Sequence, residues 1–584
     1  MQDNVVGIDL GTTNSLIGTI VEGKIKLFGD ASGGELMPSV VGMDEAGAIL
    51  VGRAARNRRV LDPQGTVVSV KRRMGTEERV RVGKRELTPP QVSALILGAL
   101  LDRAQAALGA RPDRAIITVP AWFNDAQREA TRNAGEIAGL RVERLVNEPT
   151  AAALTYQTGS EECVLVYDLG GGTFDVSILD RDQDFLEVKA SRGDTQLGGD
   201  DIDRELCELV LKRIGSAREN VDRDPRAMTR LVEAVERAKI ALSDREEVRL
   251  FDPFLAGEGD RAVHLDLPLT RADVEQVARP LVERTLRCID EALADAGTKP
   301  NALSRVLLVG GSSKMPIVAT MVSKHLGMPV QVDAEADRAV ALGASMLAGR
   351  AAGAEVAEVL VDITPHTLSV GVLDLMDLDY GAPEGEEDLA AAPVVPRDTV
   401  VPVERSRTFY TTHENQDEVR VPVVQGEGPR VGDNTWLGHL TVEGLPPSPA
   451  RSPVEVVFKL DLSGVLHATA KHVPSGRAAT VTFADSPYRL TAQKRGAARK
   501  EVEELRALVP QAPAPGKASE SELSLARSML QRAERALAAS PDAEASIRDR
   551  VQAAMKELGE AQSAGSERTQ ELIDKLSDAL LDMT

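Results

Sequence analysis

The chain has 584 residues and a formal net charge of −21, and its length allows about four domains of ordinary size. So acidic a chain lacks the clustered cations that nonspecific binding to nucleic acid or to an anionic membrane requires. Its three cysteines are far apart and its histidines are scattered, which argues against a disulfide framework and against transition-metal chemistry.

The N-terminus has no basic, apolar leader, and no apolar run approaches the roughly 20 residues of a membrane span. We therefore expect a cytoplasmic protein with neither a nucleic-acid nor a membrane partner. One basic zone, residues 53–73, is an exception to the acidic balance. It is either a solvated helix face with ion pairs or a rim that faces phosphate.

A strand, a turn and a second strand are predicted near the N-terminus and again in the middle of the chain. Residues 5–20 (VVGIDLGTTNSLIGTI) and 164–180 (VLVYDLGGGTFDVSILD) each contain an apolar run, an aspartate, a glycine turn with threonine, and another apolar run. Glycines let backbone N–H groups approach an anion closely. The repeat predicts two similar lobes that offer phosphate-binding hairpins to one cleft.

Alternating strands and helices are predicted as far as about residue 350. Residues 115–120 form a strand, and residues 124–140 form a helix capped by Asn124 or Asp125. Residues 304–321 (SRVLLVGGSSKMPIVATM) give a strand, a glycine pair and a serine-capped helix that would suit a nucleotide.

Beyond residue 363 the apolar periodicity becomes two, which predicts an antiparallel β-sandwich up to about residue 486. Pro422 lies inside one of these runs and indicates an edge strand or a bulge. The acidic segment 374–392 has no lysine or arginine, so we expect a solvated, mobile loop. After Leu490 the chain turns helical, and a Pro/Ala break at 510–517 separates one helix from about three more.

Taken in order, the DLGTT and DLGGGTFD pair, NEPTAAA, VGGSSKMP, the VLVD linker, the sandwich and the helical tail resemble the seventy-kilodalton heat-shock chaperones of DnaK type. The resemblance implies a multidomain protein. Its expected parts are an α/β, actin-like, two-lobed ATPase domain (1–355), a linker (356–362), a β-sandwich that binds peptides (363–486) and an α-helical lid (487–584).

The resemblance also implies ATP/ADP as the nucleotide, with Mg²⁺ and K⁺ as candidate cations. Asp9 and Asp168 would order the water shell of Mg²⁺. Lys71 matches the family's catalytic lysine, and Glu148 matches the acid that positions the attacking water, although alone it could simply begin a helix. The catalytic set is Lys71, Glu148, Asp168, Thr173 and Asp9.

The nucleotide-binding set is Gly11, Thr12, Thr13, Gly170, Gly171, Gly172, Gly198, Gly199, Glu236, Lys239, Ser243, Gly310, Gly311, Ser312, Lys314 and Asp337. Lys314 stands where the family usually stacks an arginine on adenine, so we expect somewhat weaker nucleotide affinity.

Further residues match the family's coupling and peptide-binding positions. Pro120 and Arg128 match a switch between nucleotide and linker, although Pro120 alone could merely end a strand. Arg144, Asn147, Thr150 and Asp362 match the surface that receives a J-domain co-chaperone. Phe409, Thr411, Thr412 and Val419 match the groove that holds extended hydrophobic peptides, although alone they would be ordinary sandwich residues. The implied partners are unfolded or extended polypeptides, a J-domain co-chaperone and a nucleotide exchange factor of GrpE type.

The chain departs from the family pattern in its VLVD linker, its acidic insertion, Pro422 and its shortened, broken lid. These departures leave alternatives to a fully coupled chaperone open. One is a holdase or exchange-factor relative whose ATP cycle is weakly coupled to peptide. Others are a small-molecule kinase on the same nucleotide fold and a noncatalytic interaction protein or filament former.

Overall fold

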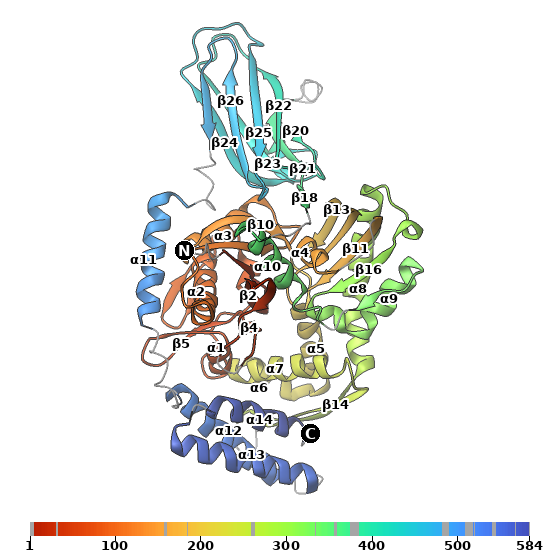
Figure 1. Ribbon diagram of the computed structural model, residues 1–584, viewed down its shortest axis with the longest axis vertical. Coiled ribbons are helices and arrows are strands. Elements are labelled where there is room, and N and C mark those ends of the chain that lie inside the picture. The colour runs from red at the N-terminus through yellow and green to blue at the C-terminus, as the bar shows by residue number, and fades with distance from the viewer. Residues whose placement is uncertain are drawn as a thin grey trace.

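The structure is a computed structural model, shown in Figure 1. It describes residues 5–30, 33–156, 161–183, 185–257, 263–332, 335–354, 359–373, 385–481, 490–508, 518, 520–539, 545–566 and 568–582. Two sheets of mixed direction, each covered by helices, make up the first part of the chain. A pair of four-stranded sheets and four helices follow. Among the described residues no helix combines the length and the apolar character needed to cross a bilayer.

The first α/β unit is built on a six-stranded sheet with strand order β10-β9-β1-β2-β3, to which β4 adds alongside β2. β1 runs antiparallel to β2 and parallel to β9. Asn124 caps α3 by accepting a hydrogen bond from the Gln127 amide, which confirms one of the two expected caps. The elements of this unit are β1 (Val5–Asp9), β2 (Asn14–Val21), β3 (Lys24–Leu27), β4 (Met37–Pro38), β5 (Val41–Met43), β6 (Ile49–Val51), α1 (Arg53–Arg58), the 3₁₀ turn Val70–Arg73, β7 (Val80–Val82), β8 (Arg85–Leu87), α2 (Pro89–Leu108), β9 (Arg114–Val119), α3 (Asp125–Ile137), β10 (Arg141–Asn147), α4 (Glu148–Leu154) and α10 (Ala339–Ala351).

The second α/β unit is built on a seven-stranded sheet with strand order β17-β16-β11-β12-β13-β18-β21. β11 and β12 pair antiparallel over their whole length, and β1 and β2 pair antiparallel from Gly7 opposite Gly18 to Asp9 opposite Leu16. The predicted repeat of a strand, turn and strand is therefore present. The elements of this unit are β11 (Glu161–Leu169), β12 (Phe174–Asp182), β13 (Phe185–Asp194), α5 (Gly199–Arg213), α6 (Arg218–Asp222), α7 (Pro225–Ala241), β14 (Glu247–Ala256), β15 (Val263–Thr270), α8 (Arg271–Asp295), β16 (Arg305–Val309), the 3₁₀ turn Gly311–Lys314, α9 (Pro316–Leu326), β17 (Gln331–Val332), β18 (Val359–Ile363) and β21 (Val400–Val401).

The predicted serine cap in the second unit is wrong. α9 begins at Pro316 after Met315, which has no side chain able to cap it. Ser312 and Ser313 instead form a 3₁₀ turn, and their hydroxyls donate to the carbonyl oxygens of Gly170 and Gly310. The serines therefore hold the turns around the cleft in place.

Two four-stranded sheets, ordered β20-β19-β23-β24 and β22-β25-β26-β27, form the predicted antiparallel β region. Phe458, Val423 and Leu440 are fully buried in their common core. The strands are β19 (Leu368–Val372), β20 (Ala390–Val395), β22 (Val403–Tyr410), β23 (Glu418–Gln425), β24 (Thr435–Glu443), β25 (Pro453–Leu460), β26 (Leu466–His472) and β27 (Ala478–Val481).

Pro422 does not lie on an edge strand, because β23 pairs with both β19 and β24. The alternative expectation, a bulge, is met: the β23–β24 register shifts between Val423 and Val424, and the β19 ladder stops at Val423. The proline therefore lies just past the last β19 pair, where its missing N–H interrupts none of the β19 pairings. Of the acidic segment, residues 374–384 lie outside the described residues, and 390–392 belong to β20.

The linker is a strand of the second unit. β18 runs parallel to β13, with Phe185 opposite Val359 and Leu186 opposite Leu360, and it pairs antiparallel with β21 at Asp362. Leu360 is 8% exposed and joins a core cluster with Val188 and Val309. Leu360 of the predicted linker is thus buried against the second sheet.

Four helices follow the sandwich, as the sequence predicts: α11 (Ala492–Ala507), α12 (Glu520–Ala539), α13 (Ala545–Ala564) and α14 (Thr569–Asp582). α11 packs against α2 and α3, and its Val502 and Leu505 are buried in the core of the first unit. α12, α13 and α14 pack on one another as a bundle. In Figure 1 this bundle lies at the opposite end of the molecule from the sandwich.

Candidate functional site

The two hairpin turns meet in a cleft between the α/β units. A cavity of about 760 Å³ is lined by Asp9, Thr13 and their neighbours from the first turn and by Asp168, Gly171 and Thr173 from the second. A side chain could not be added at Gly171, because its Cβ would lie 1.9 Å from Thr13 Oγ1. Contact between the turns therefore requires glycine at this position.

Nearly all the predicted catalytic and nucleotide-binding residues line this one cavity. All five catalytic candidates are there, and so are the nucleotide-binding candidates except Gly172 and Gly198. The Gly198 N–H caps α5 by donating to Asp201 Oδ2 (2.9 Å). A Cβ at Gly172 would lie 2.5 Å from Thr12 Cγ2, and one at Gly198 would lie 2.5 Å from the Gly171 carbonyl oxygen. These two glycines are placed behind the cavity wall, where they allow the turns to pack.

A buried cluster of acids surrounds a single lysine at the centre of the cleft. Lys71 Nζ donates to Glu148 Oε1, and both side chains are at least nine-tenths buried. Thr118 donates to Asp9 Oδ1 (2.9 Å), and the Trp122 amide donates to Asp175 Oδ1 (2.9 Å).

These acids lie in an environment that disfavours their charge. Burial first, and the charge of Glu148 second, raise the pKa of Asp9 and the pKa of Asp175 to about 7 each. The same two causes raise the pKa of Asp168 well above its usual value. Four carboxyl groups therefore share one ammonium group. Such a site gains most from a cation that neutralises it.

The donor set fits a magnesium ion that reaches the protein through water. Within the described ranges, no group of three or more acidic, histidine or cysteine side chains is placed to hold a metal ion by itself. Mg²⁺ keeps several of its waters and is often bound by one or two carboxylates together with substrate phosphates. Asp9 and Asp168 at the two turns match that mode of binding.

The rest of the cavity wall comes from α5, α7 and the turn after β16. Lys239 Nζ donates to Asp203 (2.8 Å) and to the Gly199 carbonyl (3.2 Å). Lys314 Nζ lies 3.1 Å from Asp337 Oδ1, with both side chains about one-third exposed. Gly310 has a φ of +80°, and a Cβ there would lie 2.5 Å from Asp168 Oδ1, so glycine is needed for this turn to pass the aspartate.

The sequence analysis missed several residues of the cleft. Asp175 is the last residue of the motif DLGGGTFD, so the motif itself was a signal that Asp175 belongs to the site. Thr118, which bonds Asp9, and Asp203, which pairs with Lys239, carry no sequence signal, because only folding brings them to their partners. Arg56 lines the cavity and pairs with Glu236 across the cleft (2.9 Å). This contact supports the ion-pair reading of the basic zone, whereas Lys71 in the same zone faces the acids.

Three of the predicted coupling residues form a buried, hydrogen-bonded chain that ends at Asp362 of the predicted linker. Arg128 donates to Asn147 Oδ1 (2.7 Å), and Asn147 donates to Asp362 Oδ1 (2.6 Å). Burial raises the pKa of Asp362, while Arg144 and Arg128 lower it. Thr150 is buried beside this chain in α4, and Pro120 ends β9 with its carbonyl bonded to the Phe123 amide (3.2 Å).

The sandwich contacts the same surface. The Ser463 carbonyl oxygen accepts a hydrogen bond from Arg128 (3.5 Å), and the Ser463 hydroxyl oxygen accepts one from the Leu145 amide (3.1 Å). The Asp125 amide donates to Gln425 (2.8 Å). His366, which the sequence analysis missed, contacts the Trp122 carbonyl through Nε2 (3.1 Å), and burial lowers the pKa of His366 to about 4.

The four predicted peptide-binding residues lie close together on β22, β23 and the turn between them, but only some face solvent. Val419 is buried in the sandwich core, and Thr411 is buried with its Oγ1 accepting from the Ser452 amide (2.9 Å). Thr412 is exposed, and Phe409 is half-buried against the core. Tyr410, which follows Phe409 in the sequence, is 63% exposed.

Comparison with known proteins places this architecture in a family. The family model described as "Hsp70 protein" matches residues 5–82 and 77–584. The chain is 42% identical over 485 residues to "Chaperone protein DnaK" of Thermotoga petrophila, which covers 81% of this chain and 79% of the relative. It is 40% identical over 491 residues to the protein of the same name from Thermosipho melanesiensis, covering 82% and 80%. The chain belongs to the Hsp70 family, and the expectation of an ATP-dependent chaperone with ATPase activity is confirmed.

Proposed function

We propose that this protein hydrolyses ATP in the cleft between its two α/β units and uses the cycle to bind and release extended hydrophobic segments of unfolded polypeptides. One observation carries the proposal: the buried Lys71–Glu148 pair lies between the two hairpin turns that bear Asp9 and Asp168. In this reading residues 1–355 are an actin-like ATPase domain, 356–362 the linker, 363–486 the peptide-binding sandwich and 487–584 a helical lid.

The cleft would act mainly by positioning and electrostatics, because phosphoryl transfer to water needs little covalent help from the protein. The turn N–H groups with Thr12, Thr13 and Thr173 would hold phosphate oxygens. Lys71 would stabilise charge on the γ-phosphate, and Glu148 would orient the attacking water. Mg²⁺, ordered through water by Asp9 and Asp168, would neutralise the phosphate charge, and K⁺ is a candidate second cation.

Coupling would run through the buried chain of Arg128, Asn147 and Asp362 to the sandwich. The docked arrangement in Figure 1 would be the form in which the peptide groove is loose, since the C-terminal helices lie away from the sandwich. Release of linker and sandwich after hydrolysis would then tighten peptide binding. A coupling free energy of about 1–3 kcal/mol corresponds to about 5- to 150-fold in affinity.

A J-domain co-chaperone that engages Arg144, Asn147, Thr150 and Asp362, and an exchange factor of GrpE type, would set the pace of the cycle in the cytoplasm. The departures named above, especially the broken C-terminal helices, concern the strength of coupling. They leave the cleft chemistry intact, because every catalytic candidate lines the cavity.

The test is single-turnover ATP hydrolysis, measured with and without a J-domain and an unfolded peptide. Lys71→Ala should slow hydrolysis by about 10²–10³-fold, the usual effect of removing a group that stabilises transition-state charge. Lys299→Ala, at an exposed site outside the cleft, is the matched control and should leave the rate unchanged. Asp362→Asn should retain basal hydrolysis and lose the stimulation. Equal rates for Lys71→Ala and wild type would refute the assignment of the cleft.

A second measurement tests the chaperone half of the proposal. The affinity for a leucine-rich, unfolded peptide should differ at least about 5-fold between ATP and ADP. An unchanged affinity, with hydrolysis intact, would leave an ATPase that is uncoupled from peptide.

A further inference from the structure

The C-terminal bundle packs on both α/β units at once. α12 contacts α1 of the first unit and β14 of the second. Phe251, on β14, packs against the apolar core of the bundle, where Ala533, Leu558 and Leu576 are buried. In Figure 1 the bundle lies beneath α1, α7 and β14. The bundle α12–α14 is therefore in contact with both α/β units.

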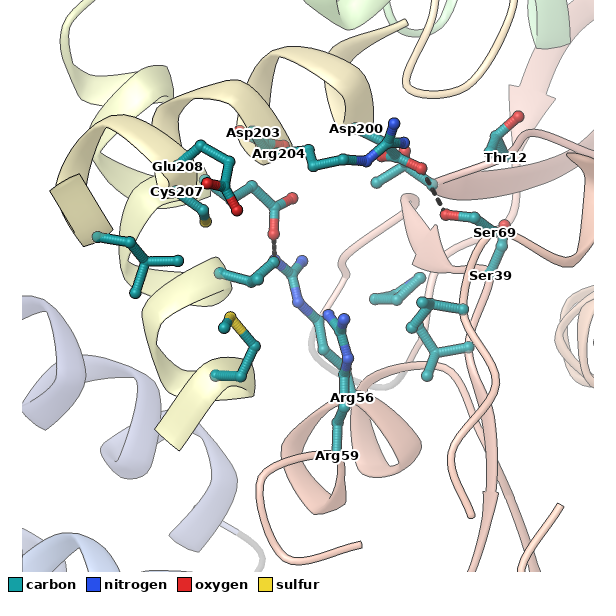
Figure 2. A pocket seen from close by; sticks show the side chains of 18 residues that line it. Thr12, Ser39, Arg56, Arg59, Ser69, Asp200, Asp203, Arg204, Cys207 and Glu208 are labelled. Carbon is teal, nitrogen blue, oxygen red and sulfur yellow. Dashed lines mark hydrogen bonds and ion pairs between the residues drawn. The ribbon is translucent and has the colours of Figure 1, made fainter. Parts of the chain in front are cut away.

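The site of this attachment is the rim of the nucleotide cleft. A second cavity, of about 300 Å³, separates α1 from α5 and α7 and is drawn in Figure 2. It shares Thr12, Thr13, Asp203 and Glu236 with the 760 Å³ cavity. Arg56 of α1 reaches across it to Glu236 of α7. The α1 helix therefore both contacts the bundle and faces the cleft.

Attachment on both sides restricts how the cleft can open. Moving α1 away from α7 and β14 would pull α12 from one of its two contacts, and Phe251 would leave the apolar core of the bundle. Exposing apolar surface to water is unfavourable, and Phe251 is half-buried. Opening is thus opposed by apolar contact as well as by the Arg56–Glu236 pair.

The bundle can also detach while α11 stays in place. α11 has its own anchors in the first unit: Val502 and Leu505 are buried, and Arg506 contacts Asp102 (2.7 Å). α11 ends at Ala507 and α12 begins at Glu520. The bundle and α11 are therefore separate helical elements with separate contacts.

We propose that the bundle α12–α14 is an internal clamp that holds the two units together and slows release of nucleotide from the cleft. The inference rests on the proposed function, because it requires that the cleft binds nucleotide. In this docked arrangement it makes the helices after the break a regulator of nucleotide exchange. Whatever displaces the bundle from α1 or β14 would accelerate exchange.

The experiment measures release of a fluorescent ADP analogue, chased with unlabelled ADP, from the full-length protein. Phe251→Glu places a charge against the bundle core and should accelerate release at least about 5-fold, the lower end of usual site-to-site coupling. Phe251→Leu keeps an apolar contact and should release at nearly the wild-type rate. Leu576→Glu weakens the bundle from its own buried core and should accelerate release like Phe251→Glu.

Hydrogen exchange on the same proteins reports whether the bundle has left. Faster exchange in α1 and β14 of both glutamate variants, together with faster release, supports the clamp. Detachment with unchanged release overturns it, and so does a wild-type protein whose α1 and β14 gain no protection from the bundle. If wild type fails to bind ADP at all, the proposed function fails first. A failed clamp, by contrast, leaves wild-type ADP binding intact.

Discussion

The nucleotide cleft and the surface that receives the sandwich both bury charged groups, but they balance them differently. In the cleft, four carboxyl groups surround Lys71, and the pKa values of Asp9, Asp168 and Asp175 are raised. At the docking surface, Arg128, Asn147 and Asp362 satisfy one another through short hydrogen bonds. In the cleft a bound cation would add counter-charge, whereas Asp362 already faces Arg144 and Arg128 of the chain itself. Ligand binding can therefore change the charge balance of the cleft directly, and the second surface changes only when its own segments move apart.

The largest expected effect comes from removing the carboxylate of Asp168, which is proposed to face the bound cation. Asp168→Asn should lower single-turnover hydrolysis by about 10²-fold or more, because one of the two carboxylates proposed to order the water shell of magnesium is lost. The same change should raise the melting temperature of the nucleotide-free protein, since a buried, poorly compensated acid is lost. Calorimetry without nucleotide checks this second effect. A variant with lower stability and normal hydrolysis would contradict both halves.

Breaking the balanced surface should undock the sandwich without harming the cleft. Arg128→Ala removes the donor to Asn147 and one of the two arginines that face Asp362, at a cost of about 3–5 kcal/mol when a buried partner is removed. Hydrogen exchange of β18 should rise accordingly. Arg132→Ala is the matched control on the same helix, because its contact with Asp461 (3.5 Å) is partly exposed and contributes about 0–1 kcal/mol. Equal exchange in the two variants would show that the buried chain does not hold the sandwich.

The excess of buried carboxyl groups in the cleft also predicts that the stability of the nucleotide-free protein depends on pH. Asp9 and Asp175 have a pKa of about 7 in the folded protein against 3.8 when unfolded, so the folded state binds more protons between about pH 4 and 7. The unfolding free energy of the nucleotide-free protein should therefore fall as pH rises through that window, by up to about 1.4 kcal/mol per pH unit for each group.

Urea unfolding at pH 5 and pH 7.5, followed by Trp122 fluorescence in a Trp436→Phe background, measures this fall. The double variant Asp9→Asn, Asp175→Asn should show a smaller difference between the two pH values. If the wild type and the double variant respond to pH alike, these two acids are not the source of the dependence.

The smallest expected effect concerns adenosine. Lys314→Arg replaces a point charge by a planar guanidinium that can stack on a purine, and it should tighten ADP binding by about 2- to 5-fold. Lys299→Arg, far from the cleft, is the control. Isothermal titration gives the affinities directly. Unchanged or weaker binding would mean that Lys314, paired with Asp337, already contributes as much to ADP binding as an arginine would.

The sequence predicts well what is local or repeated. The twin turns at Asp9 and Asp168, the Asn124 cap and the four C-terminal helices all follow from periodicity, glycine placement and capping chemistry. Errors arise where tertiary contacts override a local pattern: Ser312 and Ser313 hold turns instead of capping α9, and Pro422 lies in an interior strand beside a bulge. Thr118 and Asp203 could not be predicted from the sequence, since each acquires its partner only when distant segments pack.

The linker strand β18 has a consequence for solubility. It pairs with β13 on one side and with β21 on the other, so when it departs, two hydrogen-bonding edges are uncovered together. Phe185 at the end of β13 is already 56% exposed. Unpaired edges invite self-association, and a charge placed on them discourages it. Asp362 puts such a charge on the released strand β18 itself, and would discourage that strand from pairing with another copy of the protein.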